Sequence, residues 1–275
     1  MRVLLYVSEV EISSDEELIR KGGNMKKSVL GSTLVILLIL GVSTMSYAQD
    51  ALKDATANLE KGWQNLDSPL LEKTVKTLEE MAKKNPKDPL APYYAAKAHF
   101  AIADCLDIKS KEDFDQSGEG GNHIGAGLDL IKASLALKEE SVDTHILKFQ
   151  LLRRKMFQVG FPGLMMYVSG RNEAYNSAKA LAPDNLNVQL LSAIQVAEGG
   201  YPPPPPEKAI VEFEKLLKKD PKMADAYYEI GFIWEKAKKA DEAKKNYKKA
   251  LEINPNHHWA KKKLKVLESG SAKKT

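Results

Sequence analysis

The segment from Asp113 to Glu119 carries the residue types of a calcium-binding loop. Its sequence, DFDQSGE, places side-chain oxygens at alternate positions and a glycine where such a loop must turn. The candidate ligands are Asp113, Asp115, Ser117 and Glu119. A calcium loop also requires a bidentate carboxylate five residues further on, where this chain has Ile124. The glycines at 118, 120 and 121 equally fit a plain flexible connection, so we expect no metal and no other cofactor.

Motifs for catalysis are missing from the sequence. The histidines do not have the HExxH spacing of a zinc enzyme, and no GxSxG elbow, Walker loop or dinucleotide fingerprint occurs. Cys105 is the only cysteine, which excludes an intrachain disulfide or a cysteine-rich zinc site. It lies in an apolar helical stretch, where we expect a buried small residue. We therefore predict that the protein is not an enzyme.

Charge is unevenly distributed along the chain. The formal net charge is +4, but residues 49–204 carry 18 Lys and Arg against 21 Asp and Glu, a balance of −3. Residues 205–275 carry 18 lysines against 11 acidic residues, a balance of +7. These lysines fall on the polar sides of amphipathic helices, as on a solvated face, and arginines interleaved with aromatic residues are missing. We therefore expect no nucleic-acid partner.

Residues 25–48 have the design of a secretory signal peptide. Met-Lys-Lys at 25–27 gives the positive start, and residues 34–42 form the apolar run. Ser-Tyr-Ala at 46–48 ends the segment with small residues at the two positions that a signal peptidase reads. Gln49 would then be the first residue of the mature protein. A periplasmic or secreted location in a bacterium follows from this interpretation.

The preceding residues, 1–24, do not fit the signal design because they are acidic. Codons for Lys-Gly-Gly at 21–23 can contain a purine-rich ribosome-binding sequence. We therefore expect residues 1–24 to be an upstream leader, included by placing the start too early. An alternative for the apolar segment remains open, because the uncharged run at 28–48 is long enough for an uncleaved membrane anchor.

A helix-pair repeat is clearest between Ala224 and Pro255. Large residues stand at the outer positions, small residues stand where two helices would cross, and a proline ends the unit. The pattern consists of Tyr227, Ile230, Gly231, Trp234, Ala243, Tyr247, Ala250, Leu251 and Pro255. These residues resemble the signature of the tetratricopeptide repeat (TPR). The resemblance implies an all-α, right-handed solenoid of helix-turn-helix pairs.

Weaker versions of the pattern precede this unit. Pro221 lies one TPR period, 34 residues, before Pro255, and the five prolines at 202–206 are expected to be a spacer between two helices. About five helix pairs are predicted, the first of them opening at 51–66. The stretch at 128–137 is expected to be the second helix of the second pair. An amphipathic helix around Trp259 is expected to cap the array.

The predicted organisation of the mature chain has three parts. Residues 49–140 are expected to form degenerate helix pairs, residues 141–268 the TPR-like repeats with the capping helix, and residues 269–275 a disordered tail.

The TPR resemblance also implies where a partner would bind, since the first helices of successive pairs line a concave groove. Carried over by position, the groove residues are Tyr93, Lys97, Phe100, Gln150, Arg153, Asp225, Tyr228, Phe232 and Glu235. Aromatic, amide and charged groups together suit a peptide with mixed side chains. The predicted function is an exported scaffold that binds a protein or peptide partner, without stable insertion in the membrane once the signal is cleaved.

The alternative function belongs to another class. Exported TPR subunits of TRAP-type solute transporters resemble this plan, and they bind a receptor protein or a small apolar ligand. Residues 165–167 (Met-Met-Tyr), near Phe157 and Phe161, are the candidate apolar pocket, although such residues are more often core.

Overall fold

The computed structural model describes residues 49–110, 118–137, 141–200 and 202–272. Residues 51–275 form one compact unit, and the contacts below lie within it. The described residues form eleven helices and no strand. The first helix covers residues 49–65. It is followed by α2 (Ser68–Lys84), α3 (Leu90–Lys109), α4 (Glu119–Ala136), α5 (Val142–Val159), α6 (Met165–Leu181), α7 (Leu186–Glu198), α8 (Pro206–Lys219), α9 (Ala224–Lys236), α10 (Ala240–Ile253) and α11 (His258–Ala272).

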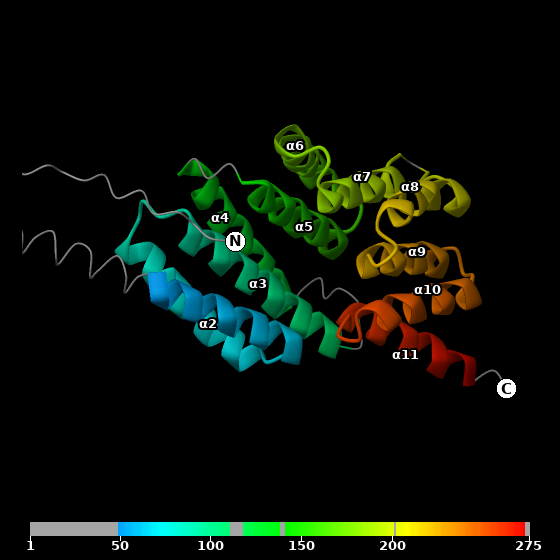
Figure 1. Cartoon of the computed structure of the whole chain (residues 1–275), viewed down its shortest axis with the longest axis horizontal. Helices are drawn as coiled ribbons and strands as arrows, with labels where there is room; N and C mark the ends of the chain where they lie inside the picture. The colour runs from blue at the N-terminus through cyan, green and yellow to red at the C-terminus, as the bar shows by residue number, and fades with distance from the viewer. Residues whose placement is uncertain (1–48, 111–117, 138–140, 201, 273–275) are drawn as a thin grey trace, which may run out of the picture. The chain divides into compact units, whose positions relative to one another are not determined.

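Consecutive helices pack as five helix-turn-helix pairs, followed by the single helix α11 (Figure 1). The first helices of successive pairs also contact one another, α3 with α5, α5 with α7, and α7 with α9. They therefore form an inner row, and the second helices pack against their partners in each pair. The predicted all-α solenoid of helix pairs is confirmed.

Local signals set the ends of several helices. Asp67 accepts a hydrogen bond from the Leu70 amide at 3.1 Å and caps α2, and Ser141 caps α5 through the Thr144 amide at 3.1 Å. Helix α8 starts at Pro206, where proline is tolerated because its missing amide would be unpaired anyway. The prolines before it form the predicted spacer between α7 and α8.

Buried side chains fill the space between neighbouring helices. The largest cluster joins α5 to α9 around Phe149 and Phe213, both fully buried. A second cluster joins the first helix, α2 and α3, and it includes Cys105, which is buried as predicted. Burial raises the pKa of the Cys105 thiol to about 11, so the thiol stays protonated and unreactive at neutral pH.

The crossing of α9 and α10 follows the predicted register. Tyr247 of α10 is fully buried against Gly231 of α9. A Cβ atom at position 231 would lie 2.7 Å from two ring carbons of Tyr247 and 3.3 Å from the Ala243 carbonyl oxygen. Glycine at 231 is therefore needed for the close approach of the two helices.

Helix α4 begins at Glu119, nine residues before the predicted start at Leu128. Gly120 and Gly121 lie inside α4 and not in a flexible connection, and Gly127 lets the same helix pack closely against its neighbours. A Cβ at Gly127 would lie 2.9 Å from Leu151 Cδ2 and 3.4 Å from the Ala96 carbonyl oxygen. Tertiary packing therefore overrides the low helix propensity of glycine in this segment.

Three of the four candidate calcium ligands, Asp113, Asp115 and Ser117, lie outside the described residues. The fourth, Glu119, is the first residue of α4, and Ile124 is fully buried in that helix. In the described ranges no group of three or more His, Cys, Asp or Glu side chains is placed to hold a metal ion.

Two further predictions concern the ends of the chain. Helix α11 extends to Ala272, so residues 269–272 are helical where a disordered tail was expected. The leader at 1–24 and the signal segment at 25–48 lie outside the described residues. Among the helices that are described, none has the length and hydropathy needed to cross a membrane.

A histidine pair joins α3 to α4. The Nδ1 atoms of His99 and His123 are 2.8 Å apart, and His99 Nε2 lies 3.3 Å from Glu79 Oε1 on α2. Burial, and then the neighbouring His99, lower the pKa of His123, while Glu119 and Glu72 oppose the shift. At mildly acidic pH the folded state therefore binds fewer protons at His123 than the unfolded state.

The contribution of His123 to the stability of the fold is therefore expected to fall as the pH drops below about 6.5, the usual pKa of histidine. His123→Asn keeps a polar group near His99 but removes the titrating ring, so the variant should lose less stability than the wild type between about pH 7.5 and about pH 5.5. Urea unfolding at both pH values measures the difference. Equal losses of stability for the two proteins would show that His123 does not contribute to the pH dependence of stability.

Candidate binding groove

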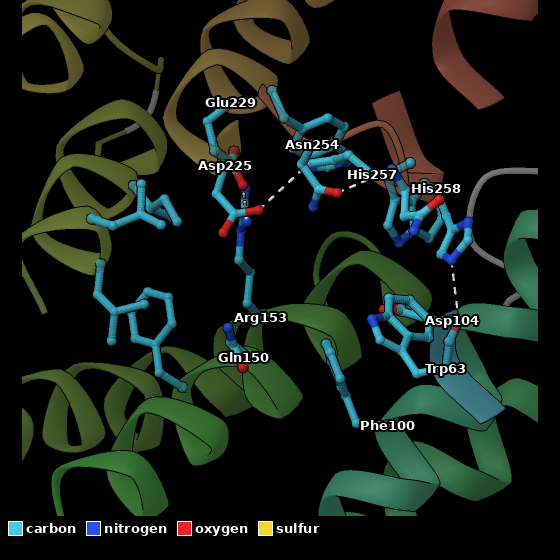
Figure 2. A pocket seen from close by; sticks show the side chains of 17 residues that line it. Trp63, Phe100, Asp104, Gln150, Arg153, Asp225, Glu229, Asn254, His257 and His258 are labelled. Atoms are coloured by element: carbon cyan, nitrogen blue, oxygen red, sulfur yellow. Dashed lines mark hydrogen bonds and ion pairs between the residues drawn. The ribbon is translucent and has the colours of Figure 1, made fainter. Parts of the chain in front are cut away.

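The inner row of helices surrounds three adjoining hollows, with volumes of about 270, 140 and 370 Å³. Phe100 and Asp104 of α3 and Gln150 of α5 line all three. The walls come from the first helix, α3, α5, α7, α9 and the start of α11. We call these three hollows together the groove. Figure 2 shows the labelled side chains of the first hollow pointing toward a common space from several helices.

Eight of the nine residues predicted to face a partner line the groove. Six of them line the two hollows nearest α9, and these are Phe100, Gln150, Arg153, Asp225, Tyr228 and Phe232. Tyr93 and Lys97 line the largest hollow, near the first helix. Glu235 lies elsewhere, because its carboxylate accepts hydrogen bonds from Tyr247 Oη at 2.6 Å and from Lys263 Nζ at 2.8 Å. That these residues bind a partner stays a prediction.

Two of the predicted contacts are mainly packing residues. Phe232 is 8% exposed, and the Tyr228 ring stacks on it with centroids 6.2 Å apart and an interplanar angle of 14°. Lys236 Nζ lies 4.4 Å from the Phe232 ring centroid, and the Phe157 ring meets Phe232 edge-on at 6.2 Å. Both aromatic rings therefore stabilise the wall of the groove as well as lining it.

Arg153 is held inside the groove by glutamates of two other helices. Its Nη1 and Nη2 atoms donate to the two carboxylate oxygens of Glu229 at 2.6 and 2.8 Å, and its Nε donates to Glu198 at 2.8 Å. Arg171 donates to the other oxygen of Glu198 at 2.7 Å. This bidentate geometry fixes the position of α5 relative to α7 and α9. It also leaves the Arg153 charge neutralised within the protein.

Arg154 forms a second, more deeply buried network. Its Nη2 donates to Asp104 at 2.7 Å and to Asp107 at 2.6 Å, and its guanidinium lies 4.7 Å from the Trp259 ring centroid. Burial raises the pKa of Asp104 to about 6, although the charge of Arg154 opposes the shift. The network joins α3, α5 and α11 in one place.

Helix α11 completes the groove by contacting the beginning of the array. His258 Nε2 lies 3.1 Å from the Trp63 carbonyl oxygen, and the two rings meet edge-on at 5.4 Å. Lys262 Nζ donates to the Asp107 carbonyl oxygen at 2.6 Å. His257 accepts from the Ala260 amide at 3.2 Å and so caps α11. The capping helix therefore also lines the binding space.

The unit from α9 to the start of α11 matches a known family of repeats. Residues 224–257 match the tetratricopeptide repeat family. The chain contains a TPR. This match covers the unit in which the signature was complete, and the other helix pairs share its helix-turn-helix arrangement.

The similarity to solved structures extends beyond this one repeat. TTC0263, a TPR protein of Thermus thermophilus, is 16% identical to this chain with a TM-score of 0.52, and the match covers 78% of this chain and 98% of that one. Human IFIT1, in a structure described as a dimer with PPP-AAAA, is 18% identical with a TM-score of 0.53, covering 80% of this chain and 47% of that one. No curated protein sequence matches this chain. At these identities the similarity shows the TPR fold alone.

Several groove residues of the TPR array were not predicted from the sequence. They are Trp63, Asp104, His257, His258 and Trp259. The sequence did contain a signal for the last three. Helix α11 begins at His258, which is one TPR period of 34 residues after the start of α9 at Ala224. Helix α11, which was predicted to be a cap, thus occupies the place of the first helix of a sixth pair. Its first turn therefore faces the groove, as the first turn of α9 does.

The candidate apolar pocket at residues 165–167 is not formed. Phe161, Met165 and Met166 are 74%, 61% and 81% exposed at the turn between α5 and α6, and none of them lines the groove. Phe157 does not join them, because its ring packs against Phe232. The cis Phe161–Pro162 bond lies in the same turn. The pocket does not form because α6 starts at Met165, which leaves Met165 and Met166 in its solvated first turn.

Proposed function

We propose that this protein is an exported scaffold whose groove holds a segment of a protein partner. The TPR fold is one that suits protein-interaction scaffolds. The observation that carries the proposal is the convergence of side chains from six helices, with exposed amide and charged groups such as Gln150, Lys97 and Asn187, on one continuous space. Aromatic walls next to exposed hydrogen-bonding groups are what a peptide backbone with mixed side chains requires.

The alternative, a TPR accessory subunit of a TRAP-type transporter, is supported only in its receptor-binding form. Its small-ligand form relied on an apolar pocket at residues 165–167, and Met165 and Met166 of that segment are exposed. The groove is instead lined by many polar and charged groups. Both functions then require a protein partner, and the identity of the captured protein separates them.

A groove-blocking variant tests the proposal. Gln150 is exposed, lines all three hollows and has no hydrogen-bond partner among the described residues, so Gln150→Trp should fill the groove without disturbing the fold. In a pulldown from envelope extract, this variant should lose a partner that the wild type retains. Glu80→Trp, an equally large change at an exposed position of α2, should retain it.

A contrasting variant tests the basic outer surface. Lys245→Glu/Lys248→Glu changes two exposed lysines of α10 and should affect mainly the association rate, with an effect that decreases in salt. Retention of the partner by Gln150→Trp together with its loss by the lysine variant at moderate salt would contradict groove binding.

Export through the signal at residues 25–48 is the second part of the proposal. Mass spectrometry of the protein from its native host should give a mature chain that begins at Gln49, since Ser-Tyr-Ala at 46–48 matches the peptidase requirement. Peptides from residues 2–21 in the native proteome would contradict the upstream-leader interpretation. A chain that retains residues 28–48 would instead support the uncleaved anchor.

A further inference from the structure

The charges that line the groove are of two kinds, those neutralised within the protein and those left facing the space. Arg153 and Arg171 are paired with Glu198 and Glu229. Arg154 is paired with Asp104 and Asp107. These networks lie in the walls and offer little net charge to an occupant.

The charged side chains that remain are mostly acidic. Glu60 of the first helix and Asp143 of α5 are exposed, line the largest hollow and have no ion-pair or hydrogen-bond partner in the described part of the chain. Asp225 of α9 is 66% exposed, and its one polar contact among the described residues is with the His257 ring at 3.1 Å. Lys97 is the single cation among these side chains. Three carboxylates against one lysine make the groove acidic, although the chain as a whole has a formal net charge of +4.

Aromatic walls accompany the two exposed carboxylates. Trp63, Tyr93 and Phe100 line the same 370 Å³ hollow as Glu60 and Asp143. Aromatic faces attract alkylammonium and guanidinium groups, and they also pack against the aliphatic stems of lysine and arginine. The carboxylates that line the hollow can then pair with the charged end. Exposed amides of Gln150 and Asn187 line the same hollow, where a peptide backbone can be hydrogen-bonded.

We propose that the groove binds a peptide segment with a lysine or arginine side chain, which lies between Trp63, Tyr93 and Phe100 and pairs with Glu60 and Asp143. This inference rests on the proposed peptide-binding function and specifies the chemistry of the partner. An acidic segment would meet like charges at Glu60, Asp143 and Asp225. A purely apolar segment would leave the carboxylates unpaired where the occupant covers them, which costs binding free energy.

The test is selection of random heptapeptides from a displayed library on the immobilised protein. Peptides whose capture is abolished by Gln150→Trp should be enriched in lysine and arginine. Replacing the basic residue of a selected peptide by norleucine should weaken binding about tenfold. The double variant Glu60→Gln/Asp143→Asn should weaken binding of the same peptide to a similar extent. The variant Lys97→Gln should strengthen its binding.

A matched control removes two carboxylates from the outer helices. Glu80 of α2 and Asp129 of α4 are exposed and line no part of the groove, so Glu80→Gln/Asp129→Asn makes the same change in net charge and should leave binding unchanged. Equal weakening by the two double variants would overturn the site and leave only a general charge effect.

The remaining outcomes separate this inference from the function on which it rests. Groove-dependent peptides without basic residues would overturn the proposed chemistry but support peptide binding. If no peptide depends on Gln150, both the inference and the proposed function are contradicted.

Discussion

Replacing Arg154 by alanine is expected to lower the free energy of unfolding by about 3–5 kcal/mol. The Arg154 residue is 7% exposed and its guanidinium is the cation placed between Asp104 and Asp107, which are 4% and 1% exposed. Removing it leaves two buried carboxylates without this partner, and the cost comes mainly from that uncompensated charge. Trp259 also loses the cation beneath its ring, so the contact of α11 with α5 should weaken.

The loss should depend on pH in a defined direction. The pKa of Asp104 is already raised to about 6 by burial, and without Arg154 it should rise further. A carboxyl group with a raised folded-state pKa contributes stability below its unfolded pKa, and that stability disappears as the pH rises through the folded value. The deficit of Arg154→Ala is therefore expected to be smaller at about pH 4.5 than at about pH 7.

Urea unfolding of three proteins measures the Arg154 prediction. The wild type, Arg154→Ala and the triple variant Arg154→Ala/Asp104→Asn/Asp107→Asn are compared at both pH values. The triple variant should recover part of the loss at neutral pH, because neutral amides cost less to bury than unpaired carboxylates. A loss below about 1 kcal/mol for Arg154→Ala, or no recovery in the triple variant, would show that the network is not what joins α3, α5 and α11.

Gly231→Leu is expected to destabilise the last helix pair by about 1–3 kcal/mol or more. A Cβ atom there would lie 2.7 Å from the Tyr247 ring, and neither the ring nor the Ala243 carbonyl can move without separating α9 from α10. Tyr247 is itself fixed by its hydrogen bond to Glu235 at 2.6 Å. The helix propensity gained on replacing glycine, about 1 kcal/mol, cannot offset this overlap.

Gly125 of α4 provides the matched control for Gly231. A Cβ at this position meets nothing within 4 Å, so Gly125→Leu should leave stability unchanged or raise it slightly through helix propensity. Chemical denaturation of the two variants makes the comparison. Equal stability changes would mean that α9 and α10 do not cross at Gly231.

The helix pairs were predictable because small and large residues recur with the TPR period and prolines mark several boundaries. Gly231 and Tyr247 specify their crossing locally, since they lie on neighbouring helices. The start of α4 was not predictable in this way. The glycines at 120 and 127 indicate a loop by propensity, and only the packing of Gly127 against α3 and α5 gives a reason for glycine in this helix.

The groove was predictable where its lining residues recur at the same position of successive first helices. First-helix positions such as Phe100, Gln150 and Tyr228 follow from the carried-over TPR pattern. The contact of α11 with the first helix does not, because the hydrogen bond from His258 to the Trp63 carbonyl joins residues 195 positions apart. The internal neutralisation of Arg153 likewise depends on Glu229, 76 positions away. Pairings over such distances are set by the curvature of the array, which no local pattern contains.

Site-specific photo-cross-linking tests the central claim most directly, that a partner lies in the groove. A photoreactive phenylalanine analogue is placed at position 150 of the full chain, inside the groove, or at position 80 on the exposed side of α2, and each protein is produced in its native host. Groove binding predicts a discrete cross-linked partner from position 150 and none from position 80. A partner captured from position 80 alone, or equally from both positions, would contradict it.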